Sequence, residues 1–321
     1  VNLPEIAPKL DFLLLEDESG SFWDDISLMQ GPPYPGLAEQ IWDGVKAQVP
    51  DLRGAVSGFC DFPVSPWGGI GDPVYEQLQD FTPNKATWLS GINSLTTYNG
   101  NDYPEAQLAG LVAGSTGGSW SYGGVTYAYT PPSWRSDATK VIVLVTDASA
   151  HVSGDSGGWP GPSYATTVAA LNSLGIHVIT LSASGSSIYD SLATATGGSH
   201  QPITTTSSNI VTAVMTALGE IRDDVTWSTD APTGITVSMS PNSYPNVENG
   251  ETVVFSETIS VSSTMTPGTY SFTVTFYFGD AVTGTQDITV TVPVPNAPPV
   301  ADAGADQTYE QSSYAGAEVI L

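Results

Sequence analysis

Two segments of this chain are apolar almost from end to end and lead directly into acidic residues. The first is LDFLLLE (Leu10–Glu16), followed by DESGSFWDD, and the second is KVIVLVT (Lys140–Thr146), followed by Asp147. A strand that is hydrophobic throughout must be buried on both faces, as the strands of parallel sheets are. We therefore expect both segments to be central strands of a parallel sheet with helices on each side.

Strand and helix patterns alternate along the chain up to about residue 225. The expected strands are Leu10–Glu16, Ala55–Asp61, Lys140–Thr146 and Ile176–Ser182. The expected helices are Leu37–Gln48, Asn84–Leu95, Pro104–Ala113 (with proline in its first turn), Tyr164–Leu174, Ile188–Thr196 and Ser207–Asp224. This alternation predicts an α/β domain over residues 1–225, with a doubly wound, mostly parallel sheet flanked by helices.

The periodicity changes after Val225. Segments such as ETVVFSETISVS and GTYSFTVTFYF alternate apolar residues with serine and threonine, and Gly, Pro and Asn turns separate them. This pattern predicts an antiparallel β-sandwich over residues 226–295. Residues 296–321 are expected to be a linker and the truncated start of a further repeat, because PVPNAPP is proline-rich and the tail VADAGADQTYEQ resembles the opening of a PKD-type repeat.

Acidic residues far outnumber basic ones, 33 against 7, which gives a formal net charge of −26. Such a surface repels phosphate backbones and anionic lipid headgroups, so we expect no nucleic-acid partner. No apolar run approaches the roughly 20 residues of a membrane helix, so no membrane insertion of this fragment is expected. Abundant Gly, Ser, Thr and Asn with scarce Lys favour an extracellular or cell-surface location.

The loop after the first expected strand carries Asp17, Ser19 and Ser21 in a D-x-S-x-S pattern. Doubly wound sheets bind ligands at the carboxyl ends of their strands. Carboxylate and hydroxyl oxygens are hard donors, suited to Mg²⁺ or Ca²⁺. The sequence therefore predicts a site for a hard divalent cation on this loop.

More acids are expected at the same rim, namely Asp61, Asp102, Glu105 and Asp147. Two carboxylates about 4 Å apart repel by roughly 1 kcal/mol in water and about 4 kcal/mol at an effective dielectric constant of about 20. A helix N-terminus, which contributes about 0.3–1 kcal/mol per acid, does not offset that repulsion for the whole set. A bound cation does.

Four segments resemble one known family, the I-like domain of integrin β subunits in the von Willebrand factor A superfamily. DESGSFWDD (Asp17–Asp25) is similar to that family's D-x-S-x-S-x-x-D-D signature, and FCDFPVSPW (Phe59–Trp67) to the segment that supplies a calcium ligand. NDYPEAQL (Asn101–Leu108) resembles the D-x-P-E loop, and VIVLVTDASAH (Val141–His151) the strand that ends in the last metal-site aspartate. The likeness spans roughly residues 10–225 and implies a von Willebrand A, Rossmann-like fold.

The resemblance implies three adjacent ions. Ser19, Ser21 and Glu105 would bind a central Mg²⁺ directly, with Asp17 and Asp147 acting through water. Asp24, Asp25 and the carbonyls of Ser21 and Thr205 would hold an adjacent Ca²⁺; Asp61, Asp102, the Pro104 carbonyl and Glu105 would hold a third ion, also Ca²⁺. The family's asparagine of the third site falls at Gly100, where Asn99 or Asn101 would substitute.

The function implied is a divalent-cation-dependent adhesion module. An open position on the Mg²⁺ would bind an acidic side chain of a protein, or another carboxylate ligand, beside the loop Gly68–Phe81. The alternative is a structural spacer whose ions only stabilise the fold. A chelatase-type A domain is a third possibility, against which the matches at Asp24, Asp25 and Asp61 speak.

No enzyme activity is expected. SGDSGG (Ser153–Gly158) matches the nucleophile motif of trypsin-like proteases, but it falls in a Gly/Pro-rich loop of an α/β domain, whereas that chemistry needs a histidine base and a buried aspartate. His151, near Asp147, either supports the metal site or, as is usual for a lone loop histidine, is solvated.

Only about ten residues precede the first expected strand, Leu10–Glu16. We therefore expect a single connection to the sandwich. A shift of the helix over residues 207–224 would then bias the metal site only weakly.

Overall fold

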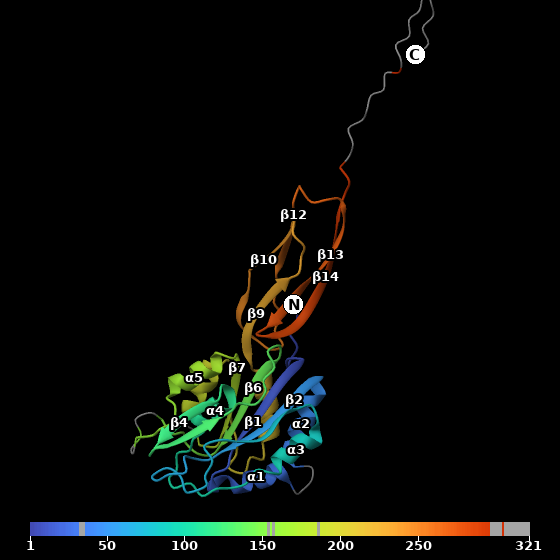
Figure 1. Cartoon of the computed structure of the whole chain (residues 1–321). Coiled ribbons are helices and arrows are strands. Elements are labelled where there is room, and N and C mark those ends of the chain that lie inside the picture. Colours follow the sequence, from blue (N-terminus) through green and yellow to red (C-terminus); the bar gives the residue numbers. More distant parts are fainter. Residues whose placement is uncertain (32–35, 153–154, 156–157, 185–186, 296–303, 305–321) are drawn as a thin grey trace, which may run out of the picture.

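A six-stranded sheet forms the centre of the computed structural model, which describes residues 1–31, 36–152, 155, 158–184, 187–295 and 304. The strand order is β3-β2-β1-β6-β7-β8 (Figure 1). The strands are β1 Lys9–Asp17, β2 Asp51–Phe59, β3 Glu76–Thr82, β6 Thr139–Thr146, β7 Ile176–Ser182 and β8 His200–Pro202. Only β3 is antiparallel to its neighbour in this sheet, which confirms the mostly parallel sheet predicted.

Helices cover both faces of the sheet. One face carries α1 Trp23–Gln30, α2 Leu37–Gln48, α3 Lys85–Ile92 and α7 Ile210–Gly219; the other carries α4 Gln107–Ser115, α5 Tyr164–Asn172 and α6 Ser187–Ala195. Along β1, Phe12 and Leu14 pack into the first layer while Leu13 and Leu15 pack into the second. Neighbouring side chains of a strand point to opposite faces, so a continuous apolar run requires this three-layer arrangement.

A hairpin that the sequence analysis did not predict covers part of the second face. It consists of β4 Gly118–Tyr122 and β5 Val125–Tyr129, joined by Gly123 and Gly124, which both have positive φ (59° and 82°). A two-residue turn of this kind requires φ > 0 at both positions, which glycine adopts without a steric penalty. The Gly-Gly pair between alternating aromatic residues was the available sequence signal.

The carboxyl-terminal part of the described chain contains separate antiparallel sheets, as predicted. A four-stranded sheet has the order β11-β9-β13-β14, and a two-stranded sheet pairs β10 with β12. These strands are β9 Arg222–Thr229, β10 Ile235–Ser240, β11 Tyr244–Glu248, β12 Ser256–Val261, β13 Gly268–Phe278 and β14 Ala281–Val292. Their core contains Val237, Met239, Phe272 and Val274. The predicted tail over 296–321 lies outside the described residues, apart from Gly304.

Among the expected helices, the limits of the last one and of the one at Pro104 differ from the structure with consequences for the rim and the sandwich. The last one ends at Gly219 rather than Asp224, and β9 begins at Arg222, so the predicted boundary at residue 225 falls inside a sandwich strand. The helix expected from Pro104 begins only at Gln107, because Glu105 forms a β-bridge with Ala150 instead. A first-turn proline permits a helix start without requiring one.

The prediction of a single connection to the sandwich is wrong. The first residues of the chain pair with residues 251–253: Leu3 N–H donates to the Glu251 carbonyl at 2.9 Å, and Val253 N–H donates to Val1 at 3.0 Å. The chain therefore leaves the sandwich before β1 and re-enters it after α7. Leu3 and Val225 belong to the same hydrophobic cluster as the sheet core, so packing is continuous across the junction.

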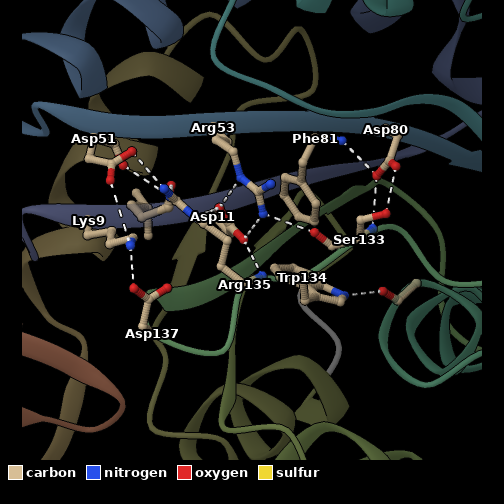
Figure 2. Close-up of polar contacts among 12 residues, drawn as sticks. Lys9, Asp11, Asp51, Arg53, Asp80, Phe81, Ser133, Trp134, Arg135 and Asp137 are labelled. Atoms are coloured by element: carbon tan, nitrogen blue, oxygen red, sulfur yellow. Dashed lines mark hydrogen bonds and ion pairs between the residues drawn. The ribbon is translucent and has the colours of Figure 1, made fainter.

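Basic side chains gather at the amino-terminal end of the sheet, near the sandwich (Figure 2). Asp11, which is fully buried, accepts hydrogen bonds from Arg53 at 2.9 and 2.6 Å and from Arg135 at 2.8 Å. Lys140, at the start of β6, pairs with Asp280 of the β13–β14 turn at 2.6 Å. Figure 1 places α1, at the carboxyl end of β1, on the far side of the domain from this junction.

We expect Asp11→Ala to destabilise the protein by about 3 kcal/mol, because it leaves two guanidinium groups without their buried partner. Asp137→Ala removes a carboxylate that is largely exposed and pairs with Lys9, so it should cost under about 1 kcal/mol. Urea unfolding of the two variants checks this. Equal, small losses would contradict a structural role for the buried carboxylate.

Candidate metal centre

The ends of β1 and β6 bring Asp17 and Asp147 to the same rim, because the two strands are parallel neighbours in register. Asp17 is fully buried and accepts hydrogen bonds from the Ser19 N–H at 2.8 Å and the Thr146 hydroxyl at 2.6 Å. Burial raises the pKa of Asp17 to about 6, although the hydrogen bonds from Thr146 and Ser19 lower it. The strand ends thus hold this carboxyl group in one orientation.

Two serine hydroxyls join the carboxyl groups of the central site. The Ser19 and Ser21 hydroxyl oxygens lie 3.1 Å apart, and Ser21 donates to Asp147 Oδ1 at 3.0 Å. The Tyr103 hydroxyl donates to the backbone carbonyl of Asp147 at 3.0 Å, so the loop before α4 is bonded to the residue that follows β6. Asp17, Ser19, Ser21 and Asp147, predicted from distant segments, therefore form one hydrogen-bonded cluster.

Glu105 reaches this rim from the segment before α4. Its backbone N–H donates to the Ser149 carbonyl at 2.9 Å and its carbonyl accepts from the His151 N–H at 3.0 Å, which fixes it against the loop after β6. Burial raises the pKa of Glu105 to about 10, and the charges of Asp17 and Asp61 add to this. Without a cation the side chain is therefore a neutral acid at pH 7.

An open hollow of about 450 Å³ adjoins the cluster and is lined by Ser19, Ser21, Tyr103 and Glu105. The backbone at Gly100 forms one wall, where a Cβ atom would lie 3.3 Å from Glu105 Oε1. Gly100 also has a φ of 59°, which favours glycine. The glycine at the position of the family's asparagine thus lets the loop approach Glu105.

The pair expected at the adjacent site opens α1. Asp25 is 2% exposed, and burial raises its pKa to about 6. Its Oδ1 atom has no hydrogen-bond partner in the part of the chain that the structure describes. Asp24 is half-buried beside it. Thr205 is exposed, and it is Ser207, two residues further on, whose side chain faces Asp25.

Glu16 was not predicted as part of any site. It is fully buried on the face of β1 that α1 and α7 cover, and within the described residues neither carboxyl oxygen has a hydrogen-bond partner. Burial and the charge of Asp25 raise its pKa well above the ordinary value. The Ser207 hydroxyl is buried as well, and it faces Asp25. The alternation of β1, which puts Glu16 on the same face as Leu14, was the available signal.

The third group of acids contains a histidine. Asp61, Asp102 and His151 each offer a ligand atom, and these atoms all lie within 4.8 Å of one another. His151 is 2% exposed, so the expectation of a solvated loop histidine is wrong. Burial lowers the pKa of His151, but hydrogen bonds with Asp61 and Asp155 and the charges of Asp61 and Asp102 raise it to about 9. The imidazolium places a positive charge between the acids.

This arrangement does not fit the all-oxygen Ca²⁺ site that the resemblance implies for Asp61, Asp102, Pro104 and Glu105. The imidazole Nε2 atom lies 3.4 Å from Asp61 Oδ2 and 3.3 Å from Asp102 Oδ1. Calcium takes oxygen ligands. The Asn101 amide, one of the expected substitutes, donates to the Gly68 carbonyl instead.

The segment Gly68–Phe81 is not a loop throughout, because its second half is the strand β3. Its start lies against the loop before α4, because the Asn101 side-chain amide donates to the Gly68 carbonyl and the Asn101 N–H donates to the carbonyl of the preceding Trp67 at 2.8 Å. Ile70, Trp23 and Tyr103 are exposed apolar or aromatic side chains on the segments that border the rim. Four residues of SGDSGG (153, 154, 156 and 157) lie outside the described residues.

No protein-family model and no curated protein matches this chain. One solved structure that the chain matches weakly is proximal thread matrix protein 1 (PTMP1) from the mussel byssus, with a TM-score of 0.43 and 13% sequence identity. The match covers 68% of this chain and 47% of the mussel chain, so this chain spans about half of that protein. Among the described residues no helix is long and apolar enough to cross a membrane.

The raised pKa values predict an unusual pH dependence for chelator-treated protein. Burial is the main cause of the rise to about 6 for Asp17, Asp25 and Asp61, against 3.8 for an ordinary aspartate. The folded protein binds these protons more tightly than the unfolded chain does. The resulting stabilisation of the folded state is fully present below pH 3.8, and it is lost as the pH rises through about 6. We therefore expect a higher Tm at pH 5 than at pH 7.5 in EDTA.

Calorimetry with Asp17→Asn as the test variant and Asp43→Asn as a surface control checks this, and the first variant should flatten the pH dependence. A saturating mixture of Mg²⁺ and Ca²⁺ should raise the Tm more at pH 7.5 than at pH 5, because it binds the ionised carboxylates. A Tm of the EDTA-treated protein that is higher at pH 7.5 than at pH 5 would contradict this account.

Proposed function

We propose that this chain contains a von Willebrand A-type domain that binds an acidic group of a partner through Mg²⁺ at the rim formed by β1 and β6. The observation that supports this best is the cluster of Asp17, Ser19, Ser21 and Asp147 beside an open hollow. Hydroxyl and carboxylate oxygens are the donors that Mg²⁺ prefers. The proposed role is adhesion at a cell surface, by a binding module rather than an enzyme.

In this proposal Ser19, Ser21 and Glu105 bind the ion directly. Asp17 and Asp147 orient waters around it, and their existing hydrogen bonds to the Ser19 N–H and the Ser21 hydroxyl hold them in place. When bound, Mg²⁺ supplies a positively charged position that a partner's carboxylate can occupy in place of water. Binding of the ion also favours the ionised form of Glu105.

The adjacent Ca²⁺ would lie at Asp24 and Asp25. The unpartnered Asp25 Oδ1 atom is an orphaned buried oxygen of the kind that a cation satisfies. Glu16, whose buried carboxyl oxygens have no hydrogen-bond partner in the described structure, and the buried Ser207 hydroxyl, which faces Asp25, are further oxygen donors here. Ser207 lies three residues before the start of α7, and α7 leads into the sandwich. An ion here would therefore link the rim to the second domain.

A structural spacer is the second candidate, because ions at these buried oxygens would stabilise the fold without any partner. Two features favour adhesion over this role. The hollow beside Ser19 and Glu105 is open, whereas a purely structural ion is usually enclosed by protein ligands. Tyr103 (60% exposed), which lines the hollow, and Trp23 (62% exposed), two residues after Ser21, offer aromatic surface for a partner.

Isothermal titration of chelator-treated protein with Mg²⁺ tests the central site. We expect Ser21→Ala to weaken Mg²⁺ binding by roughly 10–100-fold, as removal of groups around a bound metal usually does. Ser27→Ala is the matched control, since this exposed serine donates to the Trp23 carbonyl and lies outside the cluster. Equal affinities for the two variants, or no Mg²⁺ uptake by the wild type, would refute the site.

A second experiment separates adhesion from a spacer role. Immobilised peptides that display Asp or Glu are compared with their Asn or Gln counterparts, in Mg²⁺ and in EDTA. The adhesion proposal predicts retention only on acidic peptides and only with Mg²⁺, and loss of retention in Ser21→Ala. A protein that binds Mg²⁺ but shows no ion-dependent preference for carboxylates would support the spacer instead.

A further inference from the structure

Two acidic side chains from distant segments converge on the ring of His151. Its Nε2 atom faces Asp61, just after β2, at 3.4 Å and Asp102, in the loop before α4, at 3.3 Å. The three side chains come from segments far apart in the sequence, and their ligand atoms lie within 4.8 Å of one another.

The other side of the ring is held in place. The Nδ1 atom lies 2.9 Å from Asp155 Oδ2, which also accepts the Val152 N–H at 2.8 Å. Trp159 stacks on the imidazole at 4.2 Å with an interplanar angle of 23°. A carboxylate on one ring nitrogen orients the ring so that the other nitrogen faces the metal, which is the usual arrangement for metal-binding histidines. A metal ion at this site would take the place of the Nε2 proton that now faces Asp61 and Asp102.

Asp61 contributes a buried carboxylate to this cluster, and one of its oxygens is bonded only weakly. The residue is fully buried, and its Oδ1 atom accepts the Phe62 N–H at 2.7 Å. Its Oδ2 atom forms a long ion pair with His151 Nε2 at 3.4 Å and has no other hydrogen-bond partner in the described part of the chain. A buried carboxylate oxygen of this kind is costly unless a cation or a donor satisfies it.

We propose that Asp61, Asp102 and His151 bind a transition-metal ion of the Zn²⁺ class, rather than Ca²⁺. One imidazole nitrogen and two carboxylate oxygens suit zinc, whereas calcium takes oxygen ligands only. Three protein ligands leave a fourth position of a tetrahedral ion for water or a partner. Asp102 is about one-third exposed, which gives the ion a path from solvent. The site does not require an ion at Asp17 or Ser21.

Titration of the chelator-treated full chain with Zn²⁺ and, separately, with Ca²⁺ tests the proposal. His151→Gln should weaken Zn²⁺ binding by at least 100-fold, while His200→Gln is the control, because that ring bonds to Thr180 outside the cluster. Asp155→Asn leaves all three ligands in place and should weaken Zn²⁺ binding by about 10–100-fold. Ser21→Ala should leave Zn²⁺ binding unchanged, which separates this site from the proposed Mg²⁺ site.

The visible absorption of bound Co²⁺, used in place of Zn²⁺, gives a second readout. We expect a spectrum typical of nitrogen ligation and low coordination number in the wild type, and its loss in His151→Gln. Equal Zn²⁺ affinity for His151→Gln and the wild type would overturn the proposal, as would no Zn²⁺ uptake by the wild type. If His151→Gln does not fold, an unchanged affinity in Asp155→Asn would overturn it.

Discussion

The rest of this structure depends on one constraint, the burial of several carboxyl groups at the carboxyl-terminal rim of the sheet. These groups are desolvated, and their charged forms repel one another. Glu16, Asp17, Asp61 and Glu105 are all buried there, and each has a raised pKa. At the other end of the sheet Asp11 is buried too, but its charge is neutralised by ion pairs with two arginines, Arg53 and Arg135. The rim has no such arginines among its described contacts, so protons or cations must neutralise it.

The rim meets this requirement differently in its three parts. Hydroxyl groups bond to the carboxyl groups around Asp17 and Asp147, and the side chains stay next to an open hollow. Around Glu16 and Asp25 the oxygens are buried without partners in the described structure, which favours an enclosed ion. Around Asp61 an imidazole lies between the acids. These differences explain why a single set of hard-cation sites does not account for the whole rim.

The sheet and much of its rim were predictable because the strongest local signals coincide with the sheet's topology. The apolar runs at β1 and β6 require burial on both faces, and parallel neighbours necessarily bring the residues after them together. The parts that were missed depend on long-range pairing. The strand-like contacts of Val1–Leu3 with residues 251–253, and the placement of His151 between Asp61 and Asp102, involve partners that no local periodicity specifies. The end of α7 was missed although Gly219, its last residue, was a stop signal, because the residues that follow were assigned to the helix rather than to the strand RDDVTWST.

Anomalous diffraction from crystals grown with Mn²⁺ in place of Mg²⁺ tests the central claim most directly. The account predicts an anomalous peak between Ser19, Ser21 and Glu105, at the roughly 2.0–2.2 Å from the serine oxygens that a hard six-coordinate ion requires. The Ser21 hydroxyl would then no longer donate its present hydrogen bond to Asp147 in the same geometry. A map with no peak at saturating Mn²⁺, and with the Ser19, Ser21 and Asp147 hydrogen bonds unchanged, would contradict it.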